Sequence, residues 1–195
     1  ALPESLGQLT QLQWLYLGEN RLTALPECLG QLPQLQWLDL SYNRLTALPE
    51  SLGQLTQLQW LDLSYNRLTA LPESLGQLAK LERLIAENNQ LNTLPESLGE
   101  LGAKGVLKRL CLHGNTVLGL PDEVLGPTYG RSGSANPPKP PKEILDYYFS
   151  TRGGAGQALR ELRLIVVGRP KVGKTSLIKR LRGLPMDPHE VETHG

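Results

Sequence analysis

Residues 48–70 read LPESLGQLTQLQWLDLSYNRLTA, and this segment of 23 residues decides the fold. Its opening Leu-Pro pair recurs at the same interval along the first part of the chain, and once more after 26 residues, at Leu2, Leu25, Leu48, Leu71, Leu94 and Leu120. A fixed period of this length is typical of repeat proteins, in which each unit buries its apolar face only against its neighbours. The sequence therefore predicts one continuous repeat structure over residues 1–125.

Each repeat contains the pattern Leu-x-x-Leu-x-Leu-x-x-Asn-x-Leu. In the third repeat, the last four named positions of this pattern are Leu61, Leu63, Asn66 and Leu68. Leu61 and Leu63 are two residues apart, so on a short strand both side chains point into one core. We expect Asn66 to end the strand and its buried amide to satisfy backbone groups. In each Leu-Pro-Glu-Ser-Leu-Gly segment, the proline predicts the first position of a one-turn helix and the glycine predicts its end.

This pattern resembles the leucine-rich repeat family, and five units carry it, with Ala86 in place of a leucine in the fourth and three extra residues in the fifth. The resemblance implies an α/β fold, namely a horseshoe-shaped solenoid whose parallel sheet lines the inner face. No polar capping unit is evident at either end of the repeats. The sequence therefore predicts exposed leucines at both ends.

The residues that alternate with the inward leucines are expected on the concave face. They include aromatic and arginine side chains, which dominate the energetics of many protein interfaces. We predict a site for a protein or peptide partner made by Trp14, Tyr16, Trp37, Asp39, Trp60, Asp62, Arg83 and Arg109. The alternative is that duplication copied the tryptophans without selection for binding, because the second and third repeats differ only at Cys28/Ser51 and Pro33/Thr56.

Residues 126–156 differ in composition and predict a linker. Residues 126–141 read GPTYGRSGSANPPKPP, which is Gly/Ser-rich at first and then favours extended polyproline. A docking motif for a proline-binding domain is a less favoured alternative. A short helix is predicted over residues 142–149, with Ile144, Leu145, Tyr148 and Phe149 on one stripe that packs against a neighbouring domain.

Residues 157–195 predict the start of a nucleotide-binding domain. The segment from Gly168 to Thr175, GRPKVGKT, matches the phosphate-binding loop pattern and lies between an apolar strand-like run and a helical pattern. Backbone N–H groups of such a loop surround phosphate oxygens at a helix N-terminus. Lys174 is expected to contact the β- and γ-phosphates, and Thr175 to bind Mg²⁺. The predicted nucleotide contacts are Gly168, Arg169, Pro170, Lys171, Val172, Gly173, Lys174, Thr175 and Ser176.

The last residues, 185–195, contain several potential metal ligands: Asp187, His189, Glu190, Glu192 and His194. Such residues in a short polar loop are more often solvated than bound to a metal, and no cysteine lies nearby. We favour a switch segment in which Thr193 contacts Mg²⁺ and the γ-phosphate, and so orders the loop in the triphosphate state.

The order of leucine-rich repeats, EILDYYF helix, LRLIVVGRPKVGKTSLIKRL and DPHEVETHG resembles the Roco family. The resemblance implies a Ras-like GTPase domain with GTP or GDP and Mg²⁺ as cofactors, in a homodimeric signalling protein. A downstream serine/threonine kinase occurs in some members. Because residues 157–195 supply one strand and one helix of that domain, we expect this chain alone to be inactive. The alternative function is an interaction scaffold with a non-functional nucleotide domain.

The net charge of +1 conceals two parts of opposite charge. Residues 1–126 contain 8 Lys+Arg and 13 Asp+Glu, whereas the remaining residues contain 12 and 6. A nucleotide suffices as the anionic partner of the basic part, and no motif indicates nucleic-acid binding.

No apolar run reaches the ~20 residues of a membrane span. Cys28 and Cys111 fall in different repeats, which predicts free thiols in a cytoplasmic protein.

Overall fold

The computed structural model describes residues 2–128 and 139–152 of the chain. These residues include all of the repeats and the helix that follows them. The predicted phosphate loop at residues 168–176 and the predicted switch residue Thr193 lie outside the described residues, and both stay predictions.

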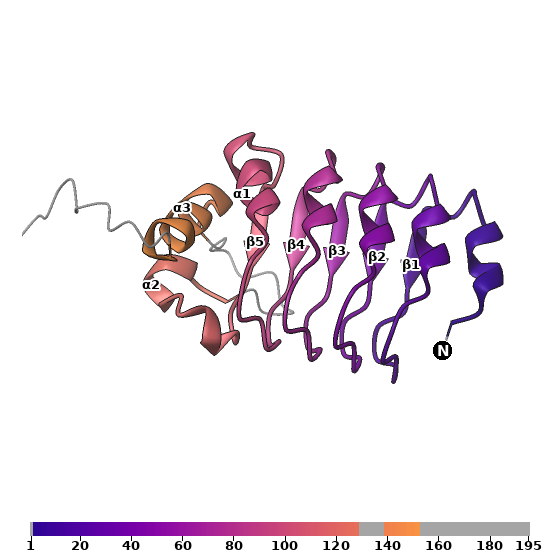
Figure 1. Ribbon diagram of the computed structural model, residues 1–195, viewed down its shortest axis with the longest axis horizontal. Helices are drawn as coiled ribbons and strands as arrows, with labels where there is room; N and C mark the ends of the chain where they lie inside the picture. The colour runs from indigo at the N-terminus through magenta and orange to yellow at the C-terminus, as the bar shows by residue number, and fades with distance from the viewer. Residues whose placement is uncertain (1, 129–138, 153–195) are drawn as a thin grey trace, which may run out of the picture. The chain divides into compact units, whose positions relative to one another are not determined.

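Five short strands form a single parallel sheet in the order in which they occur along the chain (Figure 1). Neighbouring strands pair without any shift in repeat position, so that Leu38 of one strand pairs with Leu61 of the next. The strands are β1 (Trp14–Tyr16), β2 (Trp37–Asp39), β3 (Trp60–Asp62), β4 (Arg83–Ile85) and β5 (Arg109–Cys111). The predicted parallel solenoid is thus confirmed for the repeats.

Each strand is preceded by a short helix, and the turn after the strand leads to the helix of the next repeat. Four of these helices are 3₁₀-helices, and the fifth is an α-helix. They are η1 (Glu4–Gln8), η2 (Glu27–Gln31), η3 (Glu50–Gln54), η4 (Glu73–Gln77) and α1 (Glu96–Ala103). In every case the proline directly precedes the helix, one position before the place that the sequence predicted.

The glycine of each repeat lies inside its helix, and in η1 to η4 the helix ends one residue after it, so the glycine does not itself end the helix as predicted. A Cβ atom added to Gly53 in η3 would lie 2.5 Å from the carbonyl oxygen of Ser74 in the next repeat. The same atom added to Gly30 in η2 would lie 2.4 Å from the carbonyl oxygen of Ser51. Glycine is required there because consecutive helices approach each other closely, a contact that the sequence of one repeat cannot reveal.

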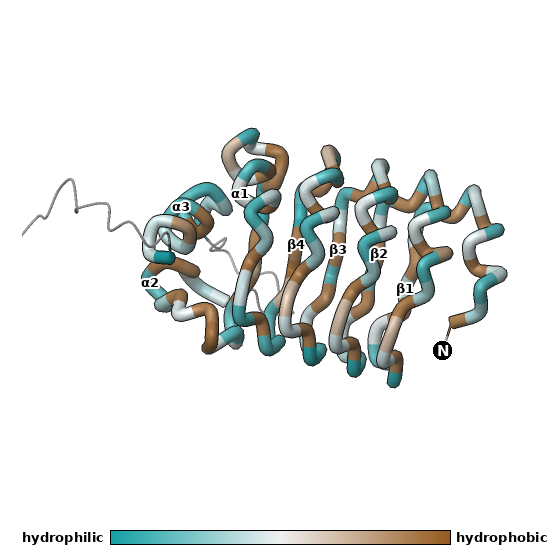
Figure 2. Tube along the Cα trace, in the orientation of Figure 1, coloured by the Kyte–Doolittle hydropathy of each residue, from teal (hydrophilic) through white to brown (hydrophobic). Residues whose placement is uncertain are grey.

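The core is a stack of leucines between the sheet and the helices. Leu38, Leu61, Leu84 and Leu110, at the centres of their strands, have no exposed surface. Figure 2 shows hydrophobic and hydrophilic segments alternating along every turn of the chain. Each turn therefore contributes one layer to a shared core, as the repeat pattern predicted.

A ladder of asparagines joins the turns where the chain leaves each strand. The side-chain nitrogen of Asn66 donates hydrogen bonds to the carbonyl oxygens of Leu40 (2.9 Å) and Leu63 (3.1 Å). Its side-chain oxygen accepts one from the Leu45 N–H at 3.0 Å. Equivalent bonds to the preceding repeat are made by Asn43, Asn89 and Asn115. The predicted role of the asparagines is confirmed.

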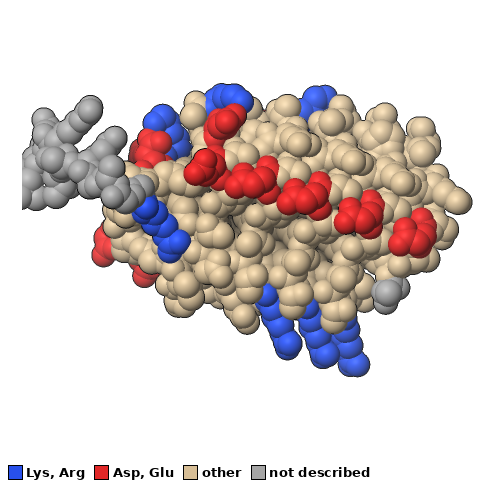
Figure 3. All heavy atoms as spheres, in the orientation of Figure 1, with Lys and Arg blue, Asp and Glu red and all other residues tan. Residues whose placement is uncertain are grey.

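Glutamates at the helix starts make a second set of links between repeats. The Ser74 N–H donates to Oε2 of Glu50 at 3.1 Å, and the Ser97 N–H donates to Oε2 of Glu73 at 3.2 Å. Each carboxylate thus caps the helix of the following repeat, where backbone N–H groups lack partners. In Figure 3 these acidic side chains form a row across consecutive turns.

The last repeat leads into η5 (Thr116–Leu118) and α2 (Asp122–Leu125), and α3 (Pro141–Arg152) then packs against the end of the solenoid. The α3 helix is longer than the predicted 142–149. Ile144, Leu145 and Tyr148 are buried in the same core cluster as the leucines of the repeats. The neighbour of the predicted apolar stripe is therefore the final repeat itself.

Polar contacts also hold α3 in place. The Leu94 N–H donates to the Tyr148 hydroxyl at 2.9 Å, and Arg152 donates to the Asn92 carbonyl at 2.6 Å. The prediction of exposed leucines at both ends was thus wrong for the C-terminal end, because α3 covers it. At the first repeat the leucines are only partly buried, and Leu9 is 52% exposed.

Candidate functional site

The first column of concave residues forms an aromatic ladder, which we define as Trp14, Trp37 and Trp60 together with Arg83. Parallel pairing brings these residues into register on neighbouring strands. The rings of Trp37 and Trp60 are stacked, with centroids 3.8 Å apart and planes inclined by 16°. The guanidinium carbon of Arg83 lies 4.6 Å from the centre of the Trp60 ring. The ring spacing is shorter than the ~4.8 Å between strands, as expected on the inside of a curved sheet.

The second column of concave residues lies two positions after the first and consists of Tyr16, Asp39, Asp62, Ile85 and Cys111. These residues pair in register on neighbouring strands, but only the first three reach solvent. Tyr16 is 65% exposed, and Asp39 and Asp62 are half-buried. Ile85 and Cys111, at the same position in the next two repeats, are buried. Burial raises the pKa of the Cys111 thiol to about 12, so it stays protonated and unreactive at neutral pH.

Two tyrosines that the sequence analysis did not single out form a further wall, the tyrosine pair Tyr42 and Tyr65. Their rings are stacked, with centroids 4.2 Å apart and planes inclined by 11°. Each precedes the asparagine of its repeat and has a left-handed backbone, with φ of 53° and 55°. The recurrence of tyrosine before Asn43 and Asn66 was the available signal, but the direction of the side chain depends on that unusual backbone.

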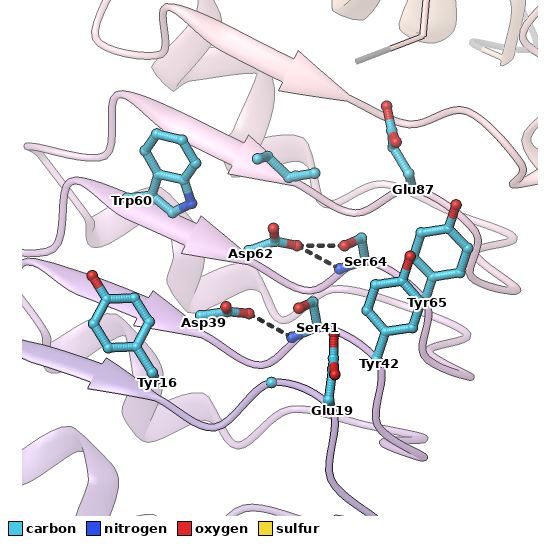
Figure 4. A pocket seen from close by; sticks show the side chains of 12 residues that line it. Tyr16, Glu19, Asp39, Ser41, Tyr42, Trp60, Asp62, Ser64, Tyr65 and Glu87 are labelled. Carbon is cyan, nitrogen blue, oxygen red and sulfur yellow. Dashed lines mark hydrogen bonds between the residues drawn. The ribbon is translucent and has the colours of Figure 1, made fainter. Parts of the chain in front are cut away.

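A groove of about 670 Å³ lies along the concave face between these aromatic groups. In Figure 4, Asp39 and Asp62 lie between Tyr16 and Trp60 on one side and the tyrosine pair on the other. A smaller groove of about 240 Å³ borders the aromatic ladder and is lined by Arg83 as well as by Trp14, Trp37 and Trp60. The predicted partner-binding residues are therefore brought together, except that Arg109 lines neither groove.

The two aspartates are held in a fixed orientation by the serines that follow them. Oδ1 of Asp39 accepts a hydrogen bond from the Ser41 N–H at 2.9 Å. Oδ1 of Asp62 accepts from the Ser64 N–H at 2.9 Å and from the Ser64 hydroxyl at 2.6 Å. Within the described part of the chain, Oδ2 of each aspartate has no hydrogen-bond partner. Each carboxylate thus keeps one acceptor oxygen for a ligand.

Burial raises the pKa of the Asp62 carboxyl above its ordinary value of 3.8, and the hydrogen bonds from Ser64 oppose this effect. Because the folded pKa is the higher one, ionisation of Asp62 costs folding free energy. The cost is absent at pH values below the ordinary pKa and is fully present above the raised pKa. A cation bound to Asp62 would offset this cost.

No group of three or more His, Cys, Asp or Glu side chains suited to a metal ion occurs within residues 2–128 and 139–152. The predicted Mg²⁺ ligands Thr175 and Thr193 lie outside those residues. Cys28 and Cys111 are free, as predicted. None of the helices that the structure describes is long and apolar enough to cross a membrane.

Comparison with known proteins identifies the repeats. The family model described as a leucine-rich repeat region matches residues 1–110. Among solved structures, a leucine-rich repeat protein of Leptospira interrogans is 47% identical, with a TM-score of 0.56 over 58% of this chain and 28% of that protein. No curated protein sequence matches.

Receptor ectodomains from plants are similar over the same region. That of the Arabidopsis thaliana membrane receptor kinase GASSHO1/SCHENGEN3, in complex with CASPARIAN STRIP INTEGRITY FACTOR 2, is 38% identical with a TM-score of 0.52. The match covers 57% of this chain and 14% of the receptor. The ectodomain of the Arabidopsis receptor kinase SOBIR1 is 31% identical, with a TM-score of 0.52 over 59% of this chain and 64% of the receptor. This chain thus spans less than a third of the length of the first two structures.

Proposed function

Since this chain belongs to the leucine-rich repeat family and its repeats form a protein-interaction module, we propose that the groove on the concave face binds an extended segment of a partner protein. The observation that carries this proposal is the aromatic ladder. Aromatic rings at a partly exposed surface offer a large apolar contact area at a small cost in side-chain entropy, and they dominate interface energetics. The receptor kinase GASSHO1/SCHENGEN3, which is similar over the repeats, is a precedent for a bound partner.

The groove also has the shape that an extended segment needs. It runs past Asp39 and Asp62, on adjacent strands, and is bordered by aromatic rings from consecutive repeats. A peptide lying along it would cross the strands and meet one repeat after another. Affinity would then come from many repeats together, as in other solenoid proteins with extended concave surfaces.

A test begins with a displayed library of peptides, from which binders to the whole chain are selected. All three tryptophans of the chain belong to the aromatic ladder, so intrinsic tryptophan fluorescence reports binding at this surface. We expect binding to change the fluorescence of the unchanged chain, while calorimetry measures the affinity of variants that lack tryptophans. Replacement of Trp37 and Trp60 together by alanine is expected to weaken binding about tenfold to hundredfold, the effect of losing one or two interface hot spots.

The matched control is Tyr147→Ala, which removes an aromatic ring that is 39% exposed on α3, away from the groove. This variant should bind as the unchanged chain does. Circular dichroism establishes that each variant keeps its fold. If the selected peptides bind the Trp37→Ala/Trp60→Ala variant with unchanged affinity, the concave face is not the binding surface.

We further propose a nucleotide-dependent switch, which rests on the sequence GRPKVGKT at residues 168–175. The Roco resemblance extends this proposal to GTP hydrolysis with Mg²⁺ in a cytoplasmic, homodimeric protein, in which the repeats recruit partners. The competing proposal is an interaction scaffold whose nucleotide domain does not function, with or without a downstream kinase. The repeats are equally compatible with both.

Nucleotide binding separates these two proposals. Labelled GDP and ADP are compared, with Mg²⁺ present, on a protein that carries a whole nucleotide-binding domain after these repeats. We expect GDP to bind selectively and Lys174→Ala to weaken it about tenfold to hundredfold, because a charge-assisted contact to phosphate is lost. Lys139→Ala, which removes a lysine before α3, serves as the control. Binding that Lys174→Ala leaves unchanged, or a folded protein that binds neither nucleotide, would favour the scaffold.

A further inference from the structure

We propose that the concave groove selects a basic segment of a partner protein, with lysine or arginine at alternate positions, whose cationic groups bind Asp39 and Asp62. This inference rests on the proposed function and specifies the chemistry of the partner. It follows from the charge of the groove, the geometry of the two carboxylates, the aromatic walls and the spacing of the strands.

The charge of the groove is of one sign. Twelve residues line it, of which four are acidic and none is basic: Glu19, Asp39, Asp62 and Glu87 are the acidic ones. Oε1 of Glu87 lies 3.5 Å from Nδ1 of the buried His113, so the cationic groups of the partner are assigned to the two aspartates and not to this glutamate. A groove lined by one sign of charge attracts a ligand of the opposite sign and repels acidic segments.

The two carboxylates are oriented before any ligand arrives. The serine hydrogen bonds hold Oδ1 of Asp39 and of Asp62, while Oδ2 of each lacks a partner among the described residues (Figure 4). A lysine or arginine that donates to Oδ2 would pair with an acceptor that is already positioned. Little conformational entropy would then be lost on the protein side of the interface.

The aromatic walls favour the long side chains of lysine and arginine. Such side chains pack their aliphatic stems along apolar surface while the charged end reaches a polar partner. These rings also attract a cationic group directly, because the Arg83 guanidinium lies 4.6 Å from the centre of the Trp60 ring. Aromatic rings on either side of a bound segment would keep water from the carboxylates, and this would strengthen the attraction between opposite charges.

The spacing of the strands sets the spacing of the basic residues. Asp39 and Asp62 pair directly on adjacent parallel strands, which are about 4.8 Å apart. In an extended peptide, alternate side chains face the same way at intervals of about 6.6 Å. The flexible side chains of lysine and arginine can span the difference. The arrangement therefore fits basic residues at positions i and i+2 of the bound segment.

The test uses two synthetic peptides that differ only in charge. One has arginine at alternate positions among serines, and the other has citrulline, a neutral side chain of nearly the same shape, at those positions. Binding to the whole chain is followed by tryptophan fluorescence and by calorimetry. We expect the arginine peptide to bind at least about tenfold more tightly than the citrulline peptide, and its affinity to fall as salt is added.

The variant that tests the site is Asp39→Asn together with Asp62→Asn. Asparagine can still accept the serine hydrogen bonds, so the fold should persist while the charge is lost. We expect the preference for arginine over citrulline to disappear. The control is Glu100→Gln together with Glu123→Gln, which removes the same charge from α1 and α2 and should leave the preference unchanged.

Several outcomes would overturn the proposal. Equal binding of the two peptides, no binding of either by the folded chain, or a preference that survives the loss of both aspartates would each do so. Equal binding that still requires Trp37 and Trp60 would leave the proposed function intact and reject only the basic partner. A synthetic peptide of residues 157–174 that binds more tightly than the arginine peptide, through the same aspartates, would assign the groove to the chain's own basic part.

Discussion

Replacement of Asn66 by alanine is expected to lower the free energy of unfolding by about 3 kcal/mol, a large part of the stability of a typical domain. The Asn66 side chain donates to the carbonyl oxygens of Leu40 and Leu63 and accepts from the Leu45 N–H, and all of these groups are buried. Alanine would leave the buried Leu45 N–H without its partner and would remove one of the two asparagine bonds to each carbonyl, because Leu40 keeps the bond from Asn43 and Leu63 keeps the bond from Asn89. Urea denaturation followed by circular dichroism measures the loss.

The same substitution at the first repeat is the matched control. Asn20 makes two hydrogen bonds of 3.0 Å within its own turn, to the carbonyl oxygens of Leu17 and Gly18, and it is exposed. Water can replace those bonds, so Asn20→Ala should cost less than about 1 kcal/mol. Equal losses for Asn20→Ala and Asn66→Ala would show that links between repeats are not what makes the asparagine important.

Replacement of Tyr148 by alanine is expected to cost about 4 kcal/mol, because a large buried ring is removed from the interface between α3 and the last repeat. The Tyr148 side chain is 2% exposed, and its hydroxyl accepts from the Leu94 N–H. Tyr148→Phe separates the two contributions. It keeps the ring and removes only the hydroxyl, and should cost about 1–3 kcal/mol for the unsatisfied N–H.

The neighbouring residue Tyr147 supplies the control for this experiment. Its ring is 39% exposed on the same helix, so Tyr147→Ala should cost less than about 1 kcal/mol. The three variants are compared by thermal and urea denaturation. A Tyr148→Ala variant as stable as Tyr147→Ala would mean that α3 does not stabilise the end of the solenoid.

The features that the sequence predicted correctly are those set by periodicity. The inward leucines, the asparagine ladder and the register of Trp37 with Trp60 all follow from a constant repeat length, because equivalent residues of stacked repeats must lie side by side. The features it missed depend on contacts between distant parts of the chain. The Tyr148 hydroxyl meets a backbone group 54 residues earlier, so the sequence predicted the helix and its apolar stripe but not that the stripe packs on the last repeat.

Two errors have the same origin. The glycines were predicted to end their helices, but Gly30 and Gly53 admit the backbone of Ser51 and Ser74 in the next repeat. The tyrosine pair went unnoticed because its direction depends on a left-handed backbone at Tyr42 and Tyr65. Neither a close approach between repeats nor a positive φ at a non-glycine residue can be inferred from a repeat pattern.

The left-handed backbone at Tyr42 and Tyr65 bears on which residue type each repeat has at the position before its asparagine. For most side chains it costs about 1 kcal/mol or more, whereas asparagine and glycine adopt it more easily. The fourth and fifth repeats have Asn88 and Gly114 at this position, whereas the first three have Glu19, Tyr42 and Tyr65, which line the groove. A repeat selected for stability alone would favour asparagine or glycine. The tyrosines thus agree with the proposed binding groove, where folding free energy would be given up for contact with a partner.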